Sequence, residues 1–165
     1  RRAPRPRQRG PRRGPRQGGS TLTQQLAKKL FLKPDRTLER KFQEMVLALW
    51  LETKFSKDEI LQLYLNRVYF GSGATGIEKA AQAYYQKSAT DLSLMEAATL
   101  AGVLKAPSNL SPATHPDAAA ARANLVINAM IETGYISRDE ADSAINSPAN
   151  VVASDYVPAT QYVVD

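Results

Sequence analysis

Residues 20–51 read STLTQQLAKKLFLKPDRTLERKFQEMVLALWL and contain two helical patterns separated by one turn with a proline. The first pattern repeats leucine at helical spacing, at Leu22, Leu26 and Leu30. It opens on Thr21-x-x-Gln24, which matches a capping box at a helix start. The spacing predicts helices over 21–32 and 37–54, and the short turn between them favours a helical hairpin.

Three more capping-box patterns begin apolar periodic segments further along the chain, at Ser56-x-x-Glu59, Ser93-x-x-Glu96 and Ser137-x-x-Glu140. Gly and Pro cluster between the segments, and no internal repeat is visible. The full pattern predicts helices over 21–32, 37–54, 57–69, 76–86, 93–104, 117–133 and 138–145. We therefore expect a mainly α domain over 17–146, and an extended exit segment over 147–165, where Val and Tyr replace the helix formers.

Residues 1–16 differ from the rest of the chain in composition. They contain eight Arg, four Pro and no acid, so they carry +8 and the remaining residues sum to −2. Such a segment buries too little apolar surface to offset its ordering entropy, and we expect it to be a disordered tail, native or produced by a frame error. An Arg-rich arm can bind nucleic acid or anionic lipid. The nearly neutral remainder holds no nucleic-acid recognition module, so we expect no nucleic-acid partner.

Composition also limits the available chemistry. The chain has no Cys, which excludes disulfides and thiol catalysis. Its single His, His115, lies in a Pro-flanked loop without companion metal ligands. We expect no cofactor, and Glu44 is the one conceivable contact for a divalent metal. No apolar run approaches the ~18–20 residues that span a bilayer.

One face of the first helix combines groups that bind anions. On a helix of 3.6 residues per turn, Thr21, Gln25 and Lys28 fall within roughly a 60° arc. A hydroxyl, an amide and an ammonium beside a helix N-terminus suit a phosphate group. The alternative is an ordinary capped surface helix.

The second helix carries a carboxylate beside an apolar run. Its apolar stripe consists of Leu38, Phe42, Met45, Val46, Leu49 and Trp50. Residues 45–51, MVLALWL, are apolar on every side, which predicts burial all round. Glu44 precedes that run, with Arg40 four residues and Lys41 three residues before it. The arrangement favours a half-buried acid with cationic neighbours, and the alternative is a common surface ion pair.

A third cation precedes the same helix. If the two helices form a hairpin, Lys28, Arg36 and Lys41 converge near the turn. Such a cluster suits a diphosphate, either as a bound group or as a leaving group that gains charge.

Several longer stretches together resemble the peptidoglycan glycosyltransferase domain of class A penicillin-binding proteins, in that family's order and spacing. They are GGSTLTQQLAK (18–28), RKFQE (40–44), KFSKDEILQLYLNRVYFGSGATGIEKAAQAYY (54–85), LSLMEAATLAGVLKAPSNLSP (92–112) and RANLVINAM (122–130). Two positions depart from the family pattern: Arg122-Ala123 replaces a basic doublet, and Lys29 stands where Asn is common.

The resemblance implies a lysozyme-like, mainly helical fold at the periplasmic face of the bacterial inner membrane. It implies polymerisation of lipid II into glycan strands, with undecaprenyl pyrophosphate as the leaving group. The implied partners are lipid II, the growing strand, the membrane surface and other cell-wall synthesis proteins, and segment 147–165 would lead towards a transpeptidase domain. Glu44 matches the family's second glutamate, near the donor pyrophosphate, and is the candidate catalytic residue. The phosphates and sugars would be held by Thr21, Gln25, Lys28, Arg36 and Lys41.

The resemblance also implies a general-base glutamate that precedes Gly18 in the family. The first acidic residue of this chain is Asp35, and residues 1–16 offer no carboxylate. We therefore expect an N-terminally truncated domain that keeps the donor-phosphate half of the site and is inactive or nearly so by itself. Three other interpretations are a non-catalytic module that binds lipid-linked pyrophosphate or a partner protein, a lysozyme-type hydrolase, and a nucleic-acid binder in which only the Arg-rich tail makes contact. The hydrolase has no use for three phosphate-directed cations.

Overall fold

The computed structural model describes residues 21–31 and 37–152 and is helical over most of this length. Within these ranges the helices are α1 (Leu22–Phe31), α2 (Leu38–Lys54), α3 (Lys57–Leu65), α4 (Ile77–Tyr85), α5 (Leu94–Val103), α6 (Pro116–Glu132) and α7 (Arg138–Ile145), with one 3-10 turn, η1 (Ala89–Asp91). The mainly α fold predicted from the sequence is confirmed. The expected tail at 1–16 and the end of the exit segment, 153–165, lie outside the described residues.

The predicted capping boxes begin the helices for which they were proposed. Before α1, the Gln24 N–H donates to the Thr21 hydroxyl, and the Thr21 N–H donates to the Gln24 side chain, both over 3.2 Å. The reciprocal bonds are also present before α3, α5 and α7. These caps satisfy backbone donors that a helix leaves unpaired at its start, so the helix boundaries follow from the sequence.

The third helix ends earlier than the sequence predicts. The periodicity favoured 57–69, but α3 stops at Leu65, and the chain turns through an antiparallel bridge between Tyr69 and Thr75. Gly76 closes this connector with a φ of 92°, and a Cβ at that position would lie 2.9 Å from the Asn66 carbonyl oxygen. Apolar spacing continues past Leu65, but the connector's glycines set the backbone path.

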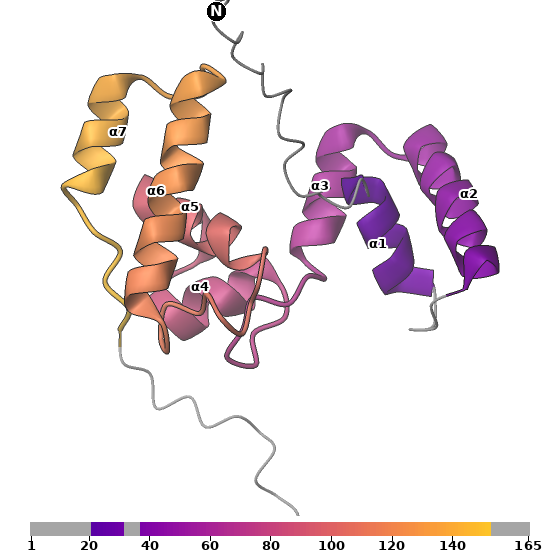
Figure 1. Cartoon of the computed structure of the whole chain (residues 1–165), viewed down its shortest axis with the longest axis horizontal. Coiled ribbons are helices and arrows are strands. Elements are labelled where there is room, and N and C mark those ends of the chain that lie inside the picture. The colour runs from indigo at the N-terminus through magenta and orange to yellow at the C-terminus, as the bar shows by residue number, and fades with distance from the viewer. Residues whose placement is uncertain (1–20, 32–36, 153–165) are drawn as a thin grey trace, which may run out of the picture.

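The helices form two groups joined by the connector over residues 66–76 (Figure 1). In the first group α1 packs against α2 and α3, and in the second α5 packs against α6 and α7. One buried cluster runs through both groups, and includes Leu26, Leu51, Tyr64, Phe70, Tyr84 and Leu100. The connector is therefore part of the core, with Phe70 fully buried at its centre.

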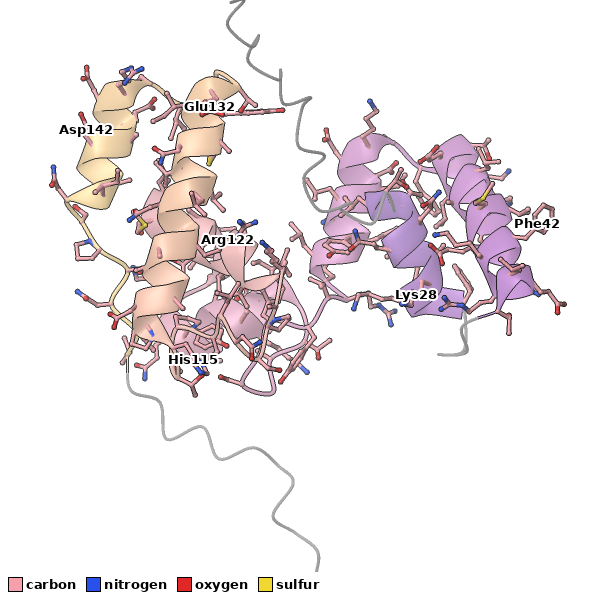
Figure 2. The ribbon with its side chains drawn as sticks, in the orientation of Figure 1. Lys28, Phe42, His115, Arg122, Glu132 and Asp142 are labelled. Atoms are coloured by element: carbon pink, nitrogen blue, oxygen red, sulfur yellow. The ribbon has the colours of Figure 1, made fainter. Side chains whose placement is uncertain are left out.

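The predicted burial of α2 on all sides is wrong. The buried face of α2 is turned towards α1 and consists of Glu44, Ala48 and Leu51. The apolar stripe lies on the other side: Leu38 is 92% exposed and Leu49 is 64% exposed. Figure 2 shows Phe42 on the side of α2 away from α1. A run that is apolar all round cannot reveal which face packs, and here the hairpin partner α1 determines it.

The fold should lose stability at acid pH, because two of its capping glutamates become protonated. The Ser56 backbone N–H donates to Glu59 over 2.7 Å and lowers the pKa of Glu59, and the Ser137 N–H lowers the pKa of Glu140 in the same way. Because the pKa of each is lower in the folded chain, the unfolded chain takes up protons first as the pH falls. This stabilisation is complete above about pH 4.3, the ordinary value for Glu, and is lost as the pH falls through the folded value.

Urea unfolding between pH 6 and pH 3 measures this effect. The Glu59→Gln, Glu140→Gln double variant keeps side chains that can complete a capping box, so it should lose less stability than the unaltered chain over this range. Identical pH profiles for the two proteins would contradict the assignment.

Candidate functional site

The first helical hairpin carries the residues for which the sequence predicted a phosphate site. Gln25 and Lys28 are exposed on α1, and Lys41 and Glu44 lie on the facing helix α2. Figure 2 shows Lys28 at the end of α1 that lies beside the start of α2. Arg36, predicted to join this group, lies outside the described residues.

Glu44 and Lys41 form the charged pair of the hairpin. The Lys41 Nζ donates to Glu44 Oε1 over 2.7 Å, with the lysine side chain 45% exposed and the glutamate 3% exposed. The sequence predicted a half-buried carboxylate with a cationic neighbour, and the structure buries it more completely. A buried carboxylate needs a charged partner, so the pair fixes the ammonium group at the rim of the α1–α2 interface.

Arg40 is a candidate site residue that the sequence indicated only as a cationic neighbour of Glu44. It lies one turn before Glu44 on the α1-facing side of α2, and its Nε and Nη1 atoms are buried without a hydrogen-bond partner. The sequence placed Arg40 beside Glu44 as an ion-pair partner, but in the structure Glu44 forms its ion pair with Lys41. Buried guanidinium donors without an acceptor are unfavourable unless an anionic ligand occupies the position.

Gln25 has a partner on α3 that no sequence pattern indicated. The Tyr64 hydroxyl donates to Gln25 Oε1 over 3.3 Å, across 39 residues of chain. Thr21 is used differently, since its hydroxyl caps the first turn of α1. It also lines a cavity of about 530 Å³ together with Glu52, Phe55 and Lys57. Thr21 directly precedes α1 and Lys28 lies in its second half, so a rise of about 1.5 Å per residue separates them by about 10 Å along the helix axis.

The described residues give no sign of a metal centre. Across 21–31 and 37–152, no three His, Asp or Glu side chains gather as metal ligands would. His115 precedes α6 and pairs with the neighbouring Thr114 hydroxyl through Nδ1 over 2.8 Å. In the same ranges, every helix is too short or too polar to cross a bilayer.

Comparison with known proteins identifies the family. The transglycosylase family model matches residues 7–131, and the chain belongs to this family. Penicillin-binding protein 1A of Aquifex aeolicus (strain VF5) is 49% identical over 149 residues, which is 90% of this chain and 20% of that protein. Penicillin-binding protein 1A of Escherichia coli (strain K12) is 46% identical over 134 residues, which is 81% of this chain and 16% of that protein.

A crystal structure shows the same likeness in three dimensions. Penicillin-binding protein 1A from Haemophilus influenzae matches with a TM-score of 0.53 and 27% identity, covering 81% of this chain and 17% of that one. The resemblance to class A penicillin-binding proteins seen in the sequence is thus confirmed. The chain spans about a fifth or less of the length of these relatives.

Proposed function

We propose that this chain acts in peptidoglycan polymerisation by binding the donor, lipid II, through its pyrophosphate. The observation that carries the proposal is Arg40, whose buried Nε and Nη1 atoms have no hydrogen-bond partner, beside the Lys41–Glu44 pair. Family membership supports the choice of ligand. The Arg40 donors at Nε and Nη1, which have no protein acceptor, suit a diphosphate, which offers several charged oxygens.

In the proposed reaction, the acceptor hydroxyl loses its proton to a base, and its oxygen bonds to the anomeric carbon of the donor sugar. The bond from that carbon to the pyrophosphate breaks with inversion, and the electron pair leaves with undecaprenyl pyrophosphate. Lys28, Arg36 and Lys41 would stabilise the charge that develops on the leaving group. Glu44 would serve this step by holding the Lys41 ammonium in place, while Thr21 and Gln25 would contact phosphate or sugar.

We expect the 165-residue polypeptide to bind lipid II but to polymerise it slowly. The general base implied by the resemblance has no counterpart before Asp35, and general base catalysis contributes roughly 10²–10⁴ in rate. The measurement is lipid II binding in detergent micelles, followed by glycan-strand formation beside a full-length relative. Strand formation at the relative's rate would contradict the expected impairment, and absence of lipid II binding would contradict the proposed function.

The proposal includes the setting of the reaction. We propose that the chain works at the periplasmic face of the inner membrane, where lipid II and the growing glycan strand meet, alongside other cell-wall synthesis proteins. We propose no resident cofactor. The Lys41 ammonium already occupies Glu44 Oε1, so it supplies the positive charge that a divalent metal would otherwise bring to this carboxylate.

A further inference from the structure

Tyr64 connects the helix core to the candidate site. Tyr64 lies on α3, is 6% exposed, and belongs to the same buried cluster as Leu26 and Ile60. Its hydroxyl lies at the edge of that cluster and donates to Gln25 Oε1 on α1. The Tyr64 ring is thus held in the core, and its hydroxyl contacts the candidate site residue Gln25.

The hydrogen bond determines which end of the Gln25 amide faces outward. An amide has an oxygen acceptor at one end and two N–H donors at the other. Because Oε1 accepts from Tyr64, the NH₂ group points away from α3. Gln25 itself is exposed, on the face of α1 that also carries Lys28. The donors are therefore available to a ligand that lies along this face.

The tyrosine is in the donating form. Its hydroxyl retains its proton throughout the neutral range, because the ordinary pKa of tyrosine is about 10, and burial raises the pKa of Tyr64 further. Gln25 would otherwise be a flexible surface side chain, and ordering a glutamine on ligand binding costs conformational entropy. A side chain that is already held in one orientation avoids much of that loss.

We propose that Tyr64 is a positioning residue, which holds the Gln25 amide with its N–H donors directed at the phosphates of the lipid-linked donor. This inference rests on the proposed function and adds a residue that the sequence did not indicate. It concerns binding geometry, because Tyr64 reaches the ligand through Gln25 and does not itself face it.

A double-mutant cycle tests the proposal with undecaprenyl pyrophosphate in detergent micelles as the probe. The dissociation constant is measured for the unaltered chain, Tyr64→Phe, Gln25→Ala and the double variant. Tyr64→Phe removes one hydroxyl and should weaken binding about threefold to tenfold, the range for one hydrogen bond. The double variant should bind no more weakly than Gln25→Ala, because the hydroxyl acts only through the amide.

Two controls separate positioning from a general structural role. Tyr85→Phe removes the hydroxyl of another buried tyrosine, at the end of α4, and should leave binding unchanged within twofold. The side-chain amide resonances of Gln25 in a ¹H–¹⁵N spectrum should shift on Tyr64→Phe and not on Tyr85→Phe.

The outcomes distinguish the two levels of the proposal. Failure of the unaltered chain to bind the probe would overturn the proposed function and this inference with it. Normal binding by the unaltered chain together with an undiminished Tyr64→Phe variant would overturn the inference alone. Additive losses in the double variant, or unchanged Gln25 resonances, would also overturn it, since Tyr64 would then act independently of Gln25.

Discussion

Replacing Arg40 with methionine should raise the free energy of unfolding by about 1–3 kcal/mol and weaken binding of undecaprenyl pyrophosphate by roughly ten- to a hundredfold. The two effects have opposite signs because the ligand-free protein buries two guanidinium nitrogens without acceptors. Methionine keeps an apolar stem of similar length and removes this unfavourable burial. It also removes the charge-assisted hydrogen bonds that the phosphates would accept.

The neighbouring residue supplies a matched control. Lys41→Met leaves Glu44 buried without its Nζ partner at 2.7 Å, so it should lower the free energy of unfolding by about 1–3 kcal/mol. Both variants lose one cation from the same helix, and both should weaken binding. Urea unfolding and titration with undecaprenyl pyrophosphate measure the two quantities. If Arg40→Met destabilises the fold as Lys41→Met does, Arg40 has a structural role and the assignment to the phosphate site is wrong.

Local sequence signals were sufficient to locate the helices. The Ser and Thr caps with a Glu or Gln three residues later fix where α1, α3, α5 and α7 begin. The caps act within one turn, so no knowledge of distant contacts is needed. The end of α3 was missed for the opposite reason. The connector there is held by distant contacts, such as the Tyr84 hydroxyl on the Phe70 carbonyl oxygen.

The candidate site was only partly predictable. Lys41 and Glu44 are three residues apart on one helix, so their pairing follows from helix geometry. The exposed side of α2 could not be predicted from the sequence. Residues 45–51 are apolar on every side of the helix, and only the position of α1 determines which face is buried. The bond between Tyr64 and Gln25 joins two helices across 39 residues, and periodicity within either helix carries no information about it.

Gly71 lies in the connector that joins the two helix groups, and we expect its substitution to destabilise the fold more than any other proposed substitution. Its φ is +87°, and a Cβ built there would lie 2.6 Å from the Pro107 carbonyl oxygen and 2.9 Å from the Tyr84 hydroxyl. Gly71→Ala should therefore lower the free energy of unfolding by about 3–5 kcal/mol, combining left-handed backbone strain with displacement of backbone atoms.

Gly134, in the turn after α6, separates these two contributions. Its φ is +74°, close to that of Gly71, but nothing lies within 4 Å of a Cβ at this position. Gly134→Ala should cost only the strain, about 1–2 kcal/mol. Both substitutions reduce the freedom of the unfolded chain by the same amount, so this term cancels in the comparison. Urea unfolding of the two variants should thus differ by the cost of the crowding at Pro107 and Tyr84. Equal losses would mean that the connector is free to move away from the second helix group, and that the buried cluster does not hold the two groups together.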